Sequence, residues 1–283
     1  MFKECIGDGG PLTVALSWVV PAAKAIYDHR EDILTGWDFV KRWLGSGKHL
    51  VFTGMPGSGK TVLLDYLSGA AFAPEYVLPD TSHSMERKKV ARSRRRMNIS
   101  VVPGQESAPR LEALEQLFLG KKPVDGIIHL VPNGFAEIRG AASASVLIEQ
   151  TALDTIAKFR ERQRALELDD FAATCQVIRR SLQKHRRPVW MLIAVSKADL
   201  YPHELLTAQA YYSHEGESPF SKCLQKLQAQ VGSDNCRLDV LPVCACLKDF
   251  DWNNQTQKSE LDEQQRNHLL CTFVKKLENF CGK

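Results

Sequence analysis

Short apolar runs alternate with amphipathic segments along the chain from residue 49 onward. Apolar runs bounded by turn residues are typical of buried strands, whereas apolar positions three or four residues apart indicate helices. The pattern predicts helices at residues 61–67, 109–119 and 259–280. It predicts strands at 49–53, 97–102, 124–131, 189–195 and 238–243, and a polar edge strand at 86–92. Such alternation favours a doubly wound α/β domain with a mostly parallel sheet.

The segment before the first strand, residues 12–47, has the pattern of two helices. In the second, apolar residues recur at helical spacing, namely at Ile33, Trp37, Val40 and Leu44. We therefore assign residues 1–47 to an N-terminal helical extension and residues 48–283 to the main domain. The extension either packs on that domain or presents an aromatic face to a partner or a membrane surface.

A long insertion, at about residues 139–188, separates two of the expected strands. A crossover between parallel strands needs only about a dozen residues. The apolar positions predict two helices within the insertion, one over 147–159 and one over 171–182.

The composition is that of an ordinary globular protein, because 44% of the 283 residues are hydrophobic and 25% are charged. The longest apolar stretch is shorter than the roughly 18 to 20 residues that span a membrane. The eight cysteines form no C-x-x-C pair, which argues against a zinc ribbon or a thioredoxin-like motif. We expect reduced thiols in a cytoplasmic protein, with peripheral membrane association as an alternative.

Positive charge is concentrated in residues 87–96, where seven of ten residues are Lys or Arg and none is acidic. Such a block can contact nucleic acid, anionic lipid or an acidic protein. No aromatic residues are interleaved to stack on bases, so a solvated segment without a partner is an equal alternative.

Residues 54–61 are glycine-rich, Gly-Met-Pro-Gly-Ser-Gly-Lys-Thr, and lie between an apolar strand and an apolar helix. They match the phosphate-binding motif G-x-x-x-x-G-K-T in its usual context. The loop turns backbone N–H groups toward phosphates, and the helix start adds its positive dipole end. We expect Lys60 to reach the β- and γ-phosphates and Thr61 to ligate Mg²⁺. The expected nucleotide-binding residues here are Gly54, Pro56, Gly57, Ser58, Gly59, Lys60, Thr61 and Val62.

Residues 196–199, Ser-Lys-Ala-Asp, follow an apolar strand and resemble N-K-x-D, the guanine-specificity motif of GTPases. A carboxylate at Asp199 accepts hydrogen bonds from N1–H and the exocyclic amine of guanine, and adenine offers neither donor on that edge. The stem of Lys197 would lie along the base. Ser196 replaces the usual Asn, which we expect to weaken hydrogen bonding between loops.

Residues 101–105, Val-Val-Pro-Gly-Gln, resemble the switch II motif D-x-x-G-Q. Gly104 would contact the γ-phosphate through its N–H, and Gln105 would orient the attacking water. Val101 stands where an Asp normally holds Mg²⁺ through a water, so we expect weaker Mg²⁺ binding and slower hydrolysis.

Two weaker matches complete the pattern. Residues 244–246, Cys-Ala-Cys, resemble the S-A-x motif that places the backbone N–H of Ala245 at guanine O6. In the polar stretch before the basic block, Thr81 is the best candidate for the switch I threonine, with Ser82 and Ser84 as alternatives.

In this order, the motifs resemble those of Ras-like P-loop GTPases over roughly residues 48–281. The resemblance implies a P-loop NTPase G domain, with a mixed, mostly parallel six-stranded sheet flanked by helices. It implies binding of GTP and GDP with Mg²⁺, nucleotide-driven switching and slow GTP hydrolysis. Gln105 and Lys60 would be catalytic, and Thr61 and Thr81 would ligate the metal. A protein effector or regulator would contact the switch regions, the N-terminal helices or the insertion.

Two other functions stay open on the sequence alone. A nucleotide-binding pseudo-GTPase scaffold is favoured by Val101 and opposed by Lys60, Thr61 and Gln105. An ATP-using P-loop enzyme needs an acidic residue after an apolar strand, and residues 127–132, Ile-Ile-His-Leu-Val-Pro, contain none.

Overall fold

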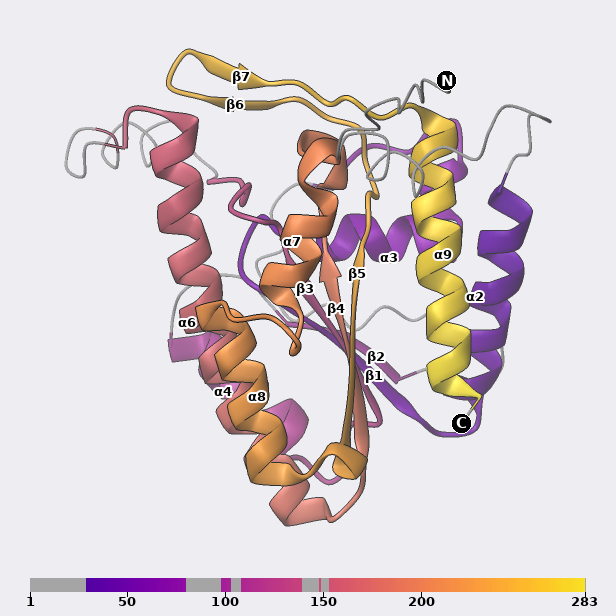
Figure 1. Cartoon of the computed structure of the whole chain (residues 1–283). Coiled ribbons are helices and arrows are strands. Elements are labelled where there is room, and N and C mark those ends of the chain that lie inside the picture. Colours follow the sequence, from indigo (N-terminus) through magenta and orange to yellow (C-terminus); the bar gives the residue numbers. More distant parts are fainter. Residues whose placement is uncertain (1–28, 80–97, 103–107, 139–147, 149–152, 283) are drawn as a thin grey trace, which may run out of the picture.

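The computed structural model describes residues 29–79, 98–102, 108–138, 148 and 153–282. Within this part of the chain, five strands form one parallel sheet in the order β2-β1-β3-β4-β5 (Figure 1). The strands are β1 (His49–Thr53), β2 (Asn98–Val101), β3 (Gly126–Val131), β4 (Val189–Val195) and β5 (Cys236–Pro242). The expected doubly wound α/β fold is confirmed, and the predicted edge strand at 86–92 lies outside the described residues.

Helices cover both faces of the sheet (Figure 1). One face carries α4 (Ala108–Phe118), α6 (Ile156–His185), α7 (Leu205–Tyr212) and α8 (Pro219–Val231). The other carries α2 (Arg30–Gly45), α3 (Lys60–Ser68) and α9 (Glu263–Cys281). Short 3₁₀ helices lie at Ala70–Phe72, Ala198–Leu200, Pro202–Glu204 and Ser233–Asn235.

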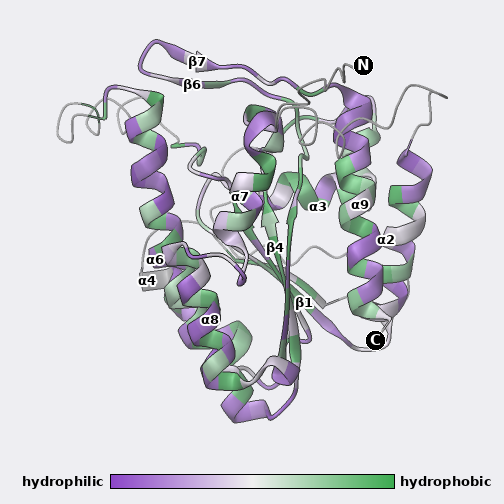
Figure 2. Ribbon diagram, in the orientation of Figure 1, coloured by the Kyte–Doolittle hydropathy of each residue, from purple (hydrophilic) through white to green (hydrophobic). Residues whose placement is uncertain are grey.

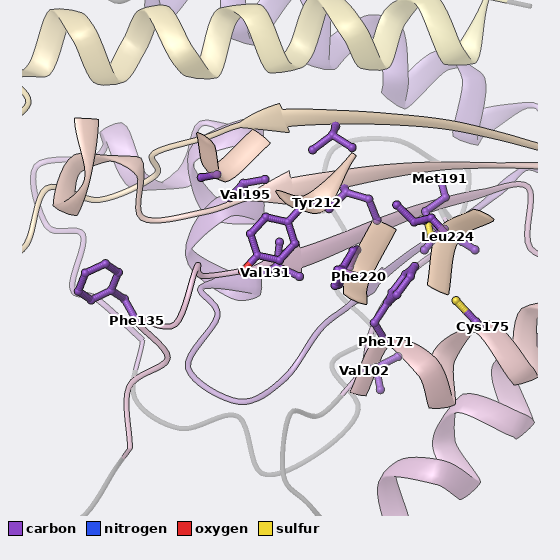
Figure 3. Packing of buried hydrophobic residues seen from close by; sticks show 14 of the residues in the cluster. Val102, Val131, Phe135, Phe171, Cys175, Met191, Val195, Tyr212, Phe220 and Leu224 are labelled. Atoms are coloured by element: carbon purple, nitrogen blue, oxygen red, sulfur yellow. The ribbon is translucent and has the colours of Figure 1, made fainter. Parts of the chain in front are cut away.

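Each sheet face has its own hydrophobic core, because every residue of β1, β3 and β4 is buried and successive side chains point to opposite faces. On the α6 and α8 side, Phe171 stacks on Phe220 at 4.3 Å between ring centres, and Tyr212 meets Phe220 edge-on at 4.9 Å. Figure 3 shows these aromatic rings beside the strands. Figure 2 shows β4 as largely hydrophobic and the outer helices as mixed polar and hydrophobic.

Helix α2 is part of the domain. Ile33, Trp37, Val40 and Leu44 are all fully buried in the core that α2 shares with α3 and α9. The two helices approach closely at Gly36, where an added Cβ would overlap Val274 of α9. These residues therefore pack on the main domain and do not present an aromatic face to a partner. Residues 1–28 lie outside the described part of the chain.

The insertion differs from the prediction. Ile156 and Phe159, assigned to the first predicted helix, lie in the same helix, α6, as the whole second predicted helix. This 30-residue helix begins after Thr155, whose side chain accepts a hydrogen bond from Lys158 N. The polar stretch between the two apolar groups contains neither Gly nor Pro, so nothing in it interrupts a helix.

Four elements have no counterpart in the predicted pattern, namely α7, α8 and the two strands of a hairpin, β6 (Phe250–Trp252) and β7 (Gln255–Gln257). The hairpin turns at Asn253 and Asn254, whose φ angles are 44° and 63°. Positive φ at both central residues is typical of a type I′ turn, which asparagine tolerates.

Candidate nucleotide-binding site

The phosphate loop joins the end of β1 to the start of α3. The chain leaves the end of β1 toward β2 and leaves the end of the neighbouring strand β3 toward β4, in the opposite direction along the sheet. Open α/β sheets bind ligands where two such connections diverge. Gly57 has φ +69°, and an added Cβ would lie 2.5 Å from the backbone N and O of Glu137. The loop therefore needs glycine here for both its conformation and its contact with the chain after β3.

Lys60 is buried and folds back over its own loop. Its Nζ donates hydrogen bonds to the carbonyl oxygens of Gly54 and Met55, both at 2.8 Å. This places the ammonium inside the curve of the loop, beside the N-terminus of α3. Thr61 and Val62 follow in the first turn of α3, both half-buried. The ammonium of Lys60 thus lies beside a helix N-terminus, a combination that can hold an anionic phosphate chain, and Thr61 carries a hydroxyl in the same helical turn.

The loop after β4 is bonded directly to the phosphate loop. Ser196 Oγ donates a hydrogen bond to the carbonyl oxygen of Ser58 at 2.8 Å, and both residues are buried. With serine in place of the usual Asn, this connection keeps one hydrogen bond between the two loops. The serine hydroxyl reaches the loop as a donor, and Tyr201 Oη donates to the carbonyl of Ser196 at 2.6 Å.

Asp199 is held by the loop after β5. Its side chain is 1% exposed, its Oδ1 accepts from Cys244 Sγ at 3.3 Å and its Oδ2 accepts from the backbone N–H of Lys248 at 3.2 Å. Ala245, half-buried, lies in the same loop. The structure thus brings together the two segments assigned to guanine recognition. A carboxylate has about four acceptor sites, so Asp199 retains acceptor capacity beyond these two bonds.

Lys197 adopts a left-handed backbone conformation with φ 59°, and its Nζ lies 3.2 Å from Glu137 Oε1 and 5.8 Å from the ring centre of Phe250. Lys248 Nζ approaches the same oxygen at 3.3 Å. Burial acts to raise the pKa of Glu137, but the two ammonium groups outweigh it and hold that pKa below its usual value. Burial lowers the pKa of Lys197 despite the neighbouring carboxylate.

Glu137 is a site residue that sequence reasoning missed. It belongs to no motif, and only the folded chain brings its backbone to Gly57 and its carboxylate to Lys197. The ion pair thus links Lys197 to the segment that contacts the phosphate loop.

A neutral histidine lies behind the phosphate loop, on β3. His129 Nδ1 and Thr53 Oγ1 are 2.8 Å apart, and the ring is fully buried. Burial, with the charges of Arg110 and Lys60, lowers the pKa of His129 to about 3. β3, the strand next to β1, therefore carries an uncharged imidazole in its middle, and neither the strand nor Pro132 after it supplies a carboxylate.

Of the residues expected to act in hydrolysis or metal binding, only some lie in the described part of the chain. Val101 is 3% exposed and packs in the apolar core with Leu63 and Leu130, so β2 offers no oxygen ligand there. Thr81, Gly104 and Gln105 lie outside the described residues, as does the basic block at 87–96.

Comparison of the sequence with protein-family models and with curated proteins finds no match. Among solved structures, the chain is similar to the signal recognition particle receptor SRb-GTP/SRX complex from Chaetomium thermophilum, with a TM-score of 0.43 at 11% identity, over 70% of this chain and 93% of that one. It is also similar to the small COPII coat GTPase SAR1 from Encephalitozoon cuniculi in complex with GDP, with a TM-score of 0.37 at 14% identity, over 89% of this chain and 90% of that one.

A third similar structure is SRb-GDP from Chaetomium thermophilum, with a TM-score of 0.35 at 12% identity, over 70% of this chain and 89% of that one. Among the described residues, no helix combines the length and apolar character of a membrane span. The chain is thus an α/β protein that carries a phosphate-loop motif and is similar in structure to small GTPases at low sequence identity, with no subfamily assigned.

Proposed function

We propose that the protein binds GTP and GDP and hydrolyses GTP slowly, as a molecular switch. The observation that carries this proposal is the hydrogen bond from Ser196 Oγ to the carbonyl of Ser58. It joins the loop with phosphate-binding chemistry to the loop with guanine-binding chemistry, so that one nucleotide can span both. Asp199 supplies the base specificity, because a carboxylate accepts hydrogen bonds from both the N1–H and the exocyclic amine of guanine.

Each end of the nucleotide has its own set of residues. Gly54, Gly57 and Gly59 allow backbone N–H groups to face the phosphates, and Lys60 supplies a charge-assisted bond. At the other end, Asp199, the stem of Lys197 and the backbone N–H of Ala245 enclose the base. Asp199 is buried and Lys197 is half-buried, which limits the access of water to the polar contacts and so strengthens them.

Mg²⁺ fits this site only in part. Thr61, in the first turn of α3, supplies a hydroxyl ligand, and Thr81 is the proposed second ligand. When bound, Mg²⁺ neutralises charge on the phosphate oxygens. Val101 gives no acceptor for a water on the metal, so the hydrolysis proposed for Gln105 and Lys60 is slow, and a partner protein or a rearranged switch segment raises it.

A nucleotide-binding scaffold without hydrolysis is the second candidate. The observation that favours it is the burial of Val101 in the apolar core, which places a hydrocarbon side chain at the strand end where a carboxylate normally holds the hydrated metal. The two candidates share the nucleotide site and differ only in turnover.

The test is an equilibrium titration of the full-length protein with fluorescently labelled GDP, followed by competition with GTP, GDP and ATP, with and without Mg²⁺. The proposal predicts that GTP and GDP displace the label at concentrations at least 100-fold lower than ATP. Equal displacement by ATP would contradict guanine recognition. A single-turnover assay with GTP then separates the candidates, because the switch releases phosphate within the assay and the scaffold does not.

A further inference from the structure

Two short side-chain patterns face each other between the start of α2 and the first half of α9. His29 caps α2 and is followed by Asp32, while His268 and Cys271 have the same three-residue spacing on α9. The helices run side by side in the same direction (Figure 1). Along the two helices, His29 lies beside His268, and one turn later Asp32 lies beside Cys271. One turn further, Gly36 packs closely against Val274.

The distances among these side chains fit a tetrahedral metal site. His29 Nδ1 lies 3.7 Å from Asp32 Oδ2, and Cys271 Sγ lies 3.8 Å from the same oxygen. Metal bonds of about 2.0 Å to nitrogen and oxygen and about 2.3 Å to sulfur place tetrahedral ligands about 3.3 to 3.5 Å apart. One ligand atom from each residue lies within 4.8 Å of the others. A shift of a few tenths of an ångström therefore completes two edges of the tetrahedron.

The donor set selects the metal. Thiolate and imidazole favour Zn²⁺ over Mg²⁺ or Ca²⁺, which prefer oxygen. Cys271 is 3% exposed, whereas the side chains of His29 and Asp32 are 20% and 33% exposed, so a buried sulfur lies beneath two ligands that solvent reaches. Zinc takes a fourth ligand, and the ring of His268 is near enough to supply it, with its centre 5.3 Å from that of His29.

We propose that His29, Asp32 and Cys271 bind one zinc ion that ties the start of α2 to α9. The site is independent of the nucleotide loops. The zinc ion fixes the start of α2, the helix that leads into β1, against α9. Lys275, one turn after Cys271, interacts with the same thiol and is displaced when the metal binds.

The test uses Co²⁺ as a spectroscopic probe on the full-length protein after treatment with a chelator. One equivalent of Co²⁺ should produce a sulfur-to-cobalt charge-transfer band even in millimolar Mg²⁺, and Zn²⁺ should abolish it. Metal analysis after reloading and gel filtration should give one zinc per chain. Cys271→Ser should remove the band, and Asp32→Asn and His29→Gln should each weaken zinc binding by at least tenfold.

Cys281→Ser is the matched control, because it removes another buried thiol of α9 that lies outside the cluster. It should keep the band, and so should Lys275→Ala. The proposal is overturned if the wild-type protein gives no band, or if the band survives in Cys271→Ser. Should Cys271→Ser fail to fold, wild-type zinc affinity in both Asp32→Asn and His29→Gln would overturn it equally.

Discussion

Ser196 Oγ donates a hydrogen bond to the backbone carbonyl of Ser58 at 2.8 Å, across more than 130 residues of sequence. The motif comparison predicts a weakened contact at this position, where serine replaces the usual asparagine. In the structure, the loop after β4 lies close enough for the serine hydroxyl to reach the phosphate loop. The bond gives the two halves of the proposed nucleotide site a fixed relative position.

Ser196→Ala should lower both stability and nucleotide affinity. The substitution leaves a buried carbonyl of the phosphate loop unpaired, which costs about 1 to 3 kcal/mol of unfolding free energy. Ser181→Ala is a matched control, because Ser181 Oγ makes an equally short buried bond to the carbonyl of Phe118, between α6 and α4. Both variants should lose stability in urea unfolding, and only Ser196→Ala should lose affinity for GDP.

Lys60→Ala should remove most of the nucleotide affinity. A charge-assisted hydrogen bond contributes about 1.5 to 3 kcal/mol, which corresponds to roughly a 10- to 100-fold change in the dissociation constant. The control is Lys48→Ala, which removes a cation at the opposite end of β1, where Lys48 pairs with Asp125. Wild-type GDP affinity in a folded Lys60→Ala variant would remove the phosphate-loop assignment.

Val101→Asp should tighten Mg²⁺ binding and raise GTP turnover. The carboxylate restores an acceptor for metal-bound water, and losses of such supporting contacts cost about 10- to 100-fold in affinity or activity. It also places a charge in an apolar core, so the variant should be less stable without Mg²⁺. Val101→Asn provides the uncharged control of similar size. An unchanged Mg²⁺ dependence of turnover in Val101→Asp would count against the Ras-like geometry.

Glu167 should make stability fall as pH rises. Burial raises the pKa of this carboxyl to about 7, although Tyr212 Oη and the N–H of Gly134 donate hydrogen bonds to it. Between about pH 4.5 and 7 the native state therefore binds more protons than the unfolded state. Protonated Glu167 therefore contributes about 3 kcal/mol to the free energy of unfolding below about pH 4.5, and this contribution is lost by about pH 7.

Glu167→Gln should remove this slope, because glutamine can still accept from Gly134 N–H and does not ionise. Urea unfolding at several pH values measures the effect, with the exposed Glu217→Gln as the control that keeps the slope. If the unfolding free energy of Glu167→Gln falls with pH as steeply as that of the wild type, other groups cause the pH dependence.

The sequence predicted the sheet better than the helical layer. β1 and β4 have the bounds that were predicted, because each is a continuous apolar run buried on both faces. α8 was missed, although Ser218 and Pro219 form a standard helix start. The side chain of Ser218 accepts a hydrogen bond from Ser221 N, as an N-cap residue does. α7 has only eight residues, too few for a helical period to be distinguished.

The candidate site could be predicted only where a motif fixes local geometry. The phosphate loop depends on its own glycines and on the helix that follows it, so its residues can be recognised from their order alone. Glu137 and His129 act through contacts with residues more than 50 positions away. A sequence period or spacing carries no information about such contacts, because the fold creates them.

The substitution Asp199→Asn tests the central claim most directly. An amide at this position loses the paired acceptors for guanine and gains a donor for the carbonyl at position 2 of xanthine, which keeps an N1–H. Affinities are measured by competition against labelled nucleotide. The variant should bind GDP at least tenfold more weakly, and xanthosine diphosphate (XDP) at least tenfold more tightly, than the wild type does. The surface control Asp239→Asn, which removes an ion pair with Lys276, should leave both affinities unchanged. A folded Asp199→Asn protein that keeps the wild-type preference for GDP over XDP would contradict guanine recognition by this residue.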